Sequence, residues 1–112
     1  MSHQPIEDTQ VFNCFVGVAQ QGWDLVQPWN HFAKSTIARQ LVRALDSIGA
    51  NLVEGDGRYG TADSIHFFVI ARASARESRY WIGVAESRNL IPVEQARSLV
   101  AQLDTVYGCL TH

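Results

Sequence analysis

The sequence predicts an all-α protein folded as an antiparallel up-down-up-down four-helix bundle. Four segments repeat apolar residues at spacings of three and four, which is the pattern of amphipathic helices, and no segment sustains the alternation of a strand. The connections between these segments are short and contain glycine or proline. Four helices with one apolar face each and short connections pack most simply in this up-down order. A chain of 112 residues has room for one core, so we expect a single domain over residues 1–112.

The first helix is expected at about residues 9–27. Gly17 and Gly22 weaken it by about 1 kcal/mol each relative to alanine, a cost that suggests close packing or a bend. Pro28 ends the helix or bends its exit. Its apolar face is formed by Val11, Phe12, Phe15, Val18, Ala19, Leu25 and Val26.

The second helix is expected at about residues 36–54, after a connection over residues 28–34, with Ser35 as its N-cap. This segment has the cleanest helical periodicity in the chain. The glycine-rich stretch 55–60 follows it and allows a tight reversal through residues with positive φ. The apolar face is formed by Ile37, Leu41, Ala44, Leu45, Ile48, Leu52 and Val53.

The third and fourth helices are expected at about residues 62–88 and 92–110. Thr61 begins the third, and Pro92 suits the first position of the fourth because that position needs no amide proton. The stripe of the third helix contains Ile65, Phe68, Val69, Ala75, Ile82 and Ala85. The stripe of the fourth contains Ala96, Leu99, Val100, Leu103, Val106, Tyr107 and Leu110.

Composition excludes several classes of protein. The net charge of −2 and the single lysine do not suggest strong non-specific nucleic-acid binding. No apolar run approaches the roughly 20 residues of a membrane span, and no signal peptide is evident, so we expect a cytoplasmic protein.

Two cysteines, Cys14 and Cys109, are too few for a disulfide framework or a zinc site. We expect two buried, reduced thiols, although the bundle could bring them together. We expect no metal, cofactor or catalytic residue, because the four histidines are scattered; they are His3, His31, His66 and His112.

A polar line runs along the end of the second helix. Ser47, Asn51 and Glu54 share one helix face through spacings of four and three, and Arg58 follows the glycine loop. These residues form either a small polar pocket or a structural cap. We favour the cap, in which Asn51 and Glu54 satisfy loop amides and Arg58 pairs with the carboxylate, because a glycine reversal leaves many backbone groups to satisfy.

An arginine stripe marks the third helix at Arg72, Arg76 and Arg79, and Arg39 and Arg43 of the second helix can extend it. Arginines at helical spacing can grip phosphates. The alternative is a solvated or subunit-facing stripe paired with acidic residues, and arginine is favoured at protein interfaces. The acidic residues available for such pairing are Glu77, Asp46 and Glu86.

The aromatic residues exceed what a small bundle can bury. Trp23, Trp29, Tyr80 and Trp81 cannot all fit inside together with five phenylalanines, and the adjacent pair Tyr80-Trp81 points to different faces of one helix. Exposed aromatic residues mark association sites, so self-association is the better hypothesis.

Residues 38–60, ARQLVRALDSIGANLVEGDGRYG, carry a resemblance to a known family. The matching positions are Gln40-Leu41, Arg43-Ala44, Ser47-Ile48, Asn51 and Glu54-Gly55-Asp56-Gly57-Arg58, with weaker likeness at Phe67 to Glu77 and Asn89-Leu90-Ile91. The chain resembles the bacterial four-helix-bundle family first named for proteins encoded in 23S ribosomal RNA intervening sequences. Arg72, Arg76 and Arg79 depart from the long aliphatic residues that the family often has in its third helix.

The resemblance implies a four-helix bundle that assembles as a ring-like homopentamer, in a family most of whose members have no assigned activity. A more distant relative, the accessory protein of diversity-generating retroelements, is a basic pentamer that binds a reverse transcriptase and nucleic acid. Our leading hypothesis is a non-enzymatic homo-oligomer, a pentamer, that serves as a scaffold or interaction module. The alternative is a nucleic-acid-binding accessory protein that contacts RNA, DNA or a reverse transcriptase.

Overall fold

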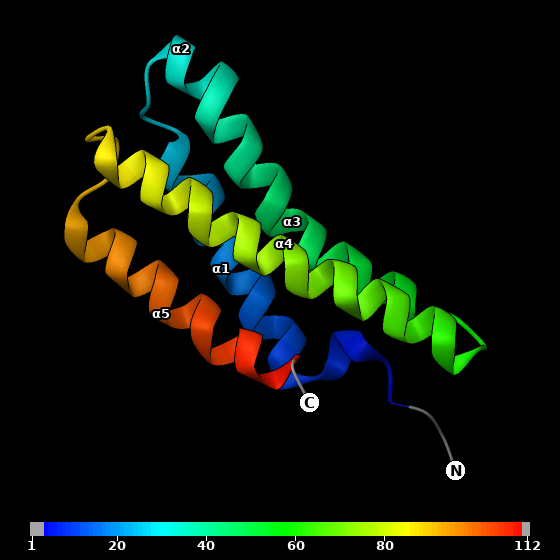
Figure 1. Ribbon diagram of the computed structural model, residues 1–112. Helices are drawn as coiled ribbons and strands as arrows, with labels where there is room; N and C mark the ends of the chain where they lie inside the picture. The colour runs from blue at the N-terminus through cyan, green and yellow to red at the C-terminus, as the bar shows by residue number, and fades with distance from the viewer. Residues whose placement is uncertain (1–3, 111–112) are drawn as a thin grey trace.

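The protein is a bundle of four antiparallel helices, 49 × 24 × 19 Å, seen in a computed structural model that describes residues 4–110 without the side chains of Val106 and Cys109. The helices of the bundle are α1 (Gln10–Val26), α3 (Arg39–Asp56), α4 (Thr61–Ser87) and α5 (Val93–Cys109). Helix α4 lies between α3 and α5, and α1 contacts α3 and α5 from the other side (Figure 1). The described residues contain no strand, so the predicted fold class is confirmed.

The second helix of the bundle begins earlier than residue 36. A short helix α2 (His31–Ala33) and a π-helical turn η2 (Lys34–Ala38) lead directly into α3, and a 3₁₀ turn η1 (Ile6–Asp8) precedes α1. The cap is Asn30, whose side-chain oxygen accepts a hydrogen bond from the Ala33 amide at 2.9 Å. The predicted cap, Ser35, instead lies within the helix and donates to the Phe32 carbonyl at 3.0 Å. The prediction was wrong because asparagine is as good an N-cap residue as serine. The helix therefore starts at Asn30 and continues through the π-helical turn that contains Ser35 and Thr36.

The reversals also differ from expectation. No glycine of the described chain has a positive φ, and the residue that does is Asn89, at φ 61° in the turn between α4 and α5. Pro92 is the N-cap of α5 and not its first residue. Gly55 has a different role, because a Cβ there would lie 2.8 Å from the Phe68 ring and 3.1 Å from the Phe67 Cβ. It allows α3 and α4 to approach closely where the chain turns.

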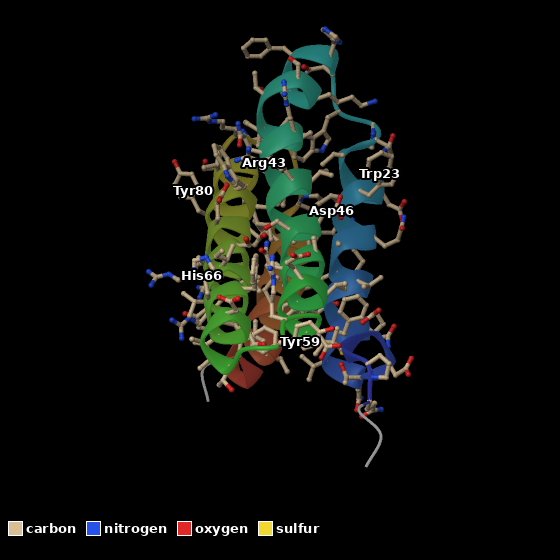
Figure 2. The ribbon with its side chains drawn as sticks, turned by 90° about the vertical axis from the view of Figure 1, so that its right-hand side faces the viewer. Trp23, Arg43, Asp46, Tyr59, His66 and Tyr80 are labelled. Carbon is tan, nitrogen blue, oxygen red and sulfur yellow. The ribbon has the colours of Figure 1, made fainter. Side chains whose placement is uncertain are left out.

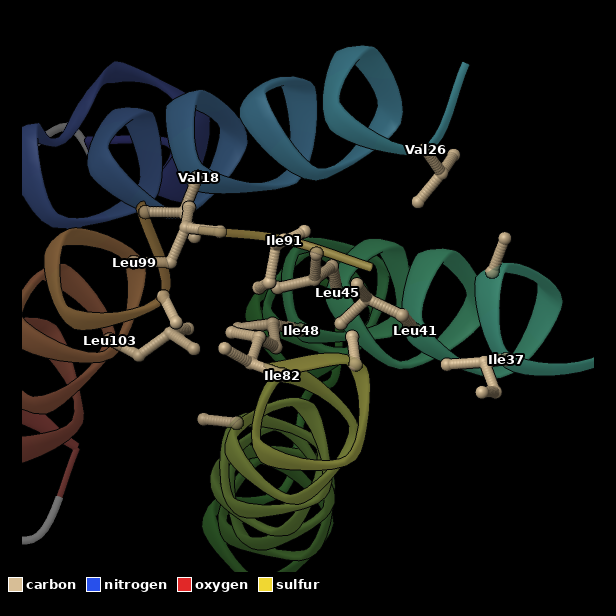
Figure 3. Packing of buried hydrophobic residues seen from close by; sticks show 14 of the residues in the cluster. Val18, Val26, Ile37, Leu41, Leu45, Ile48, Ile82, Ile91, Leu99 and Leu103 are labelled. Carbon is tan, nitrogen blue, oxygen red and sulfur yellow. The ribbon is translucent and has the colours of Figure 1, made fainter. Parts of the chain in front are cut away.

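Branched aliphatic side chains from α1, α3, α4 and α5 pack together along the axis of the bundle (Figure 3). Trp29 joins this core at 8% exposure, so among the four aromatic residues that cannot all fit inside, it is one that does. Gly22 of α1 lies against the Leu45 side chain, so close packing is the reason for that glycine.

Helix α4 contributes mostly small residues to the core. Its buried positions are Ala71, Ser74, Ala75, Ser78, Ile82 and Ala85. The predicted stripe was right from Ala75 onward but wrong at Ile65 and Val69, which are 54% and 45% exposed. Hydrophobic periodicity missed the buried serines and favoured the larger side chains, whereas α3 packs so closely on α4 that only small residues fit between them.

Candidate functional site

The polar line of α3 is a structural element. The Ser47 hydroxyl donates to the Ser74 hydroxyl of α4, and the Asn51 side-chain amide donates to the Ser47 carbonyl at 2.8 Å. The Ser78 hydroxyl donates to the Ser74 carbonyl at 2.8 Å within α4. These bonds satisfy polar groups between two tightly packed helices and connect α3 to α4 at one height.

The loop after α3 is closed in a manner only partly expected. Arg58 pairs with Glu54 at 2.5 Å, as predicted, and its guanidinium lies 4.6 Å from the centre of the Phe67 ring. The predicted capping of loop amides by Asn51 and Glu54 is wrong, because the Gly57 and Arg58 amides bond to backbone carbonyls of α3. The Ser64 hydroxyl donates to the Gly55 carbonyl at 2.8 Å and completes the closure. The motif therefore closes the loop structurally, and of the predicted cap only the pairing of Arg58 with Glu54 is present.

The arginines do not form one surface. Arg79 forms an ion pair of 3.0 Å with Asp104 of α5, which was not among the expected partners. Glu77 accepts a hydrogen bond from the Trp81 indole at 3.1 Å. The expected pairing failed for Arg79 because it faces across to another helix, and periodicity along one helix does not show which neighbour it meets.

Arg39 and Arg43 of the predicted surface lie beside its two aromatic residues, Tyr80 and Trp81, in a groove between α3 and α4. Arg39, Arg43, Tyr80, Trp81 and Arg88 line an open groove that we call the cationic groove. The Tyr80 and Trp81 rings meet edge to face with their centres 5.0 Å apart. Figure 2 shows Arg43 and Tyr80 side by side on this surface. Sequence reasoning missed Arg88, although the antiparallel order that places the end of α4 beside the start of α3 would have indicated it.

The remaining positions of this groove are polar or aliphatic. They are Ser35, Thr36, Ile37 and Gln40. In the described part of the chain no carboxylate lines the groove, and neither Arg39, Arg43 nor Arg88 is in an ion pair. Guanidinium groups without an acidic neighbour can bind a phosphate or carboxylate group of a ligand.

A second groove runs between α1 and α3, and we call it the α1–α3 groove. Trp23, predicted as surplus aromatic surface, is 53% exposed and lies at this groove with Asp46 (Figure 2). Asp46 is exposed, but the neighbouring groove side chains desolvate its carboxyl enough to raise its pKa above the ordinary value. The position of Asp46 was missed because nothing in α3 alone shows what faces it. The groove is lined by Phe12, Phe15, Val16, Ala19, Gln20, Trp23, Leu45, Asp46, Gly49, Ala50 and Val53.

A third surface lies on α4, opposite the buried face of that helix. Ile65, Val69, Arg76 and Tyr80 share one side through spacings of four, seven and four, and all are exposed. We call it the outer α4 face. Tyr80 is 63% exposed and belongs both to this face and to the edge of the cationic groove. Arg72, half-buried, lies one turn before Arg76.

The side chains that the structure describes, which exclude that of Cys109, contain no cluster of histidine, cysteine or acidic residues that could hold a metal ion. Cys14 is exposed, so the expectation of a buried thiol is wrong for it, and the Cys109 side chain, His3 and His112 lie outside what the structure describes. None of the described helices is long and apolar enough to cross a membrane.

Comparison with known proteins agrees with the fold. A family model described as "23S rRNA-intervening sequence protein" matches residues 7–112. No curated protein matches the chain. The chain is similar to a crystal structure of a protein of unknown function from the S23 ribosomal protein family of Bacteroides thetaiotaomicron, with 25% identity and a TM-score of 0.80. That similarity covers 89% of this chain and 94% of the other.

Proposed function

The chain belongs to the 23S rRNA-intervening sequence protein family, and from that premise we propose that it acts as a non-enzymatic homo-oligomeric scaffold, assembled as a pentamer. The observation that supports this most is the presence of two separate apolar surfaces on one small bundle. The α1–α3 groove exposes Val16, Trp23 and Val53, and the outer α4 face exposes Ile65, Val69 and Tyr80.

These surfaces suit a ring more than a two-fold dimer. A two-fold dimer needs one patch that is complementary to itself, whereas a ring needs two different patches that fit each other. The groove lies between α1 and α3, and the other face lies on the side of α4 that points away from the core. A subunit with two complementary patches on different sides offers one to each neighbour.

The mass of the assembly in solution tests this proposal. Light scattering coupled to size-exclusion chromatography at tens of micromolar should give about five times the subunit mass of 12.5 kDa. Replacement of Trp23 by Glu, which changes an exposed side chain, should reduce the mass while circular dichroism shows that the helices persist. A wild-type monomer at that concentration would end the proposal.

The cationic groove supports a second candidate, a nucleic-acid-binding accessory protein of a ribonucleoprotein or reverse-transcriptase system. Arg39, Arg43 and Arg88 surround two aromatic rings, and such a combination can hold phosphates while an exposed ring stacks on a base. The net charge of −2 argues against broad electrostatic binding, so the candidate depends on this one groove.

A gel-shift titration with structured RNA and with single-stranded DNA at physiological salt separates the two candidates. Accessory binding predicts a shift that the double replacement Arg39→Ala with Arg43→Ala abolishes. Replacement of Arg97, an exposed arginine of α5, is the matched control and should leave the shift unchanged. The absence of a shift, or its loss after a slight increase in salt, counts against nucleic-acid binding.

A further inference from the structure

Asp46 and Arg76 are both left without a partner inside the subunit. Within residues 4–110, Asp46 makes no ion pair or hydrogen bond, although the other side chains of the α1–α3 groove are almost all apolar or small. Arg76 is likewise unpaired, and exposed apolar side chains flank it along the outer α4 face. The groove thus combines apolar residues with one negative charge, and the outer α4 face combines them with the positive charge of Arg76, one turn from the half-buried Arg72.

We propose that the outer α4 face of one copy packs into the α1–α3 groove of the next copy, with Arg76 of one paired to Asp46 of the other. This inference rests on the proposed homo-oligomer and identifies the two surfaces that form its repeated contact. The occupant of the groove is a second copy of this chain. The mode of binding is a helix lying in a groove between two helices.

The heights of the residues along the bundle favour this pairing. The hydroxyl–hydroxyl contact between Ser47 and Ser74 places those two residues at the same level of α3 and α4. We call the end of the bundle at which α2 lies the upper end. The helices are antiparallel and rise about 1.5 Å per residue, so Asp46 lies about 1.5 Å above the level of the two serines and Arg76 about 3 Å above it. The two charged residues therefore differ in height by only about 1.5 Å.

A closed ring preserves these heights between neighbours. When the symmetry axis runs along the helices, rotation moves each copy around the axis without shifting it along the axis. Arg76 of one copy then arrives at the level of Asp46 of the next, within easy reach of its long side chain.

The apolar parts of the two surfaces match in the same arrangement. Val53 lies six residues below Ser47 and Val69 five residues below Ser74, which is about 9 Å and about 7.5 Å below the common level. The valine of the outer α4 face therefore meets the lower, apolar part of the groove. Within each helix the valine lies seven residues from the charged residue, Val53 from Asp46 and Val69 from Arg76, so one register satisfies both pairs.

The position of Asp46 adds a physical reason for the partner, because its carboxyl is exposed in the free subunit and is only partly desolvated by the groove. A neighbour that covers the groove removes more water from the carboxylate, which is costly unless a cation replaces the lost solvation. A guanidinium group can supply two parallel hydrogen bonds to the carboxylate and offset that cost. A like charge at either position would be repelled, so the pairing also selects the register.

Charge exchange tests the inference. The single variants Asp46→Arg and Arg76→Asp each place like charges together, and each should weaken subunit association at least about tenfold. The double variant, which restores opposite charges in exchanged positions, should recover most of the wild-type mass in light scattering. Circular dichroism confirms that each chain is folded, and the milder Asp46→Asn and Arg76→Gln serve if a reversed charge disturbs folding.

Asp24→Arg is the matched control, because Asp24 is an exposed carboxylate of α1 that faces the α5 side of the bundle. It should assemble as the wild type does. If the wild type is a ring and both single variants keep its mass, the inference is wrong while the proposed scaffold stands. If both single variants dissociate and the double variant does not recover, the pairing is also refuted. A monomeric wild type refutes the scaffold and the inference together.

Discussion

Replacement of Gly55 by alanine is a direct test of the close approach between α3 and α4. Gly55 is buried in the last turn of α3, and the added Cβ would lie 2.8 Å from one carbon of the Phe68 ring and 3.1 Å from the Phe67 Cβ. The ring can rotate, but the Phe67 Cβ is attached to the backbone and moves only with the helix. The substitution therefore requires a shift of one helix against the other.

Two effects of opposite sign determine the outcome. Alanine is favoured over glycine within a helix by about 1 kcal/mol, which alone would stabilise the protein. Overpacking a tight contact costs about 1–3 kcal/mol. We expect the steric cost to dominate, so Gly55→Ala should lower the free energy of unfolding by up to about 2 kcal/mol.

Gly83→Ala provides the matched control. Gly83 is a helical, exposed residue of α4, and a Cβ added there meets nothing within 4 Å. This variant should gain the full helical preference of about 1 kcal/mol. The difference between the two variants then equals the steric cost alone, about 1–3 kcal/mol, because the helical preference cancels.

Urea denaturation monitored by circular dichroism measures both free energies, provided that all samples have the same protein concentration, since association adds to apparent stability. The reasoning is refuted if Gly55→Ala is as stable as Gly83→Ala. That outcome would mean that α3 and α4 do not approach at Gly55 as closely as the structure shows.

Three further expectations concern the cap, an ion pair and the groove carboxylate. Asn30→Ala should cost about 1 kcal/mol of stability in urea denaturation, whereas Ser35→Ala should be nearly neutral; equal losses would place the cap elsewhere. Breaking the exposed pair of Arg79 and Asp104 by Arg79→Ala should cost less than about 1 kcal/mol, and the loss should shrink at high salt; a loss unchanged by salt would show that packing, not charge, is responsible. Because burial raises the pKa of Asp46, the folded subunit binds its proton more tightly than the unfolded chain, so the stability that this group contributes is present at low pH and is lost as the pH rises through its folded pKa. In dilute, dissociated subunits Asp46→Asn should therefore be more stable than the wild type at pH 7, and the advantage should disappear as the pH falls below 3.8; an advantage that persists there contradicts the assignment.

The elements of the fold could be predicted from local patterns. Spacings of three and four along the chain located all four long helices, and the absence of alternation excluded strands, because these patterns depend on the geometry of a single element. The motif from Ser47 to Arg58 was found for the same reason, since its members lie within three turns of one helix and the loop that follows. Errors within elements occurred where two residues served equally well, as at the cap between Asn30 and Ser35.

The positions of side chains relative to other helices could not be predicted in this way. Arg79 meets Asp104, and Arg43 meets Tyr80, across long separations in the sequence. Asp46 faces α1 and not the arginines of α4, and its groove exists only because α1 packs beside α3.

The sequence by itself therefore determined that this chain forms four helices, in which order they reverse, and to which family it belongs, since each of these depends on residues that are close along the chain. Only the tertiary structure decided which arginines gather with aromatic rings, that small residues form the buried face of α4, and that Asp46 and Arg76 remain unpaired on different sides at one height. The physical reason is that periodicity specifies the faces of a helix, whereas packing between distant helices specifies what each face meets.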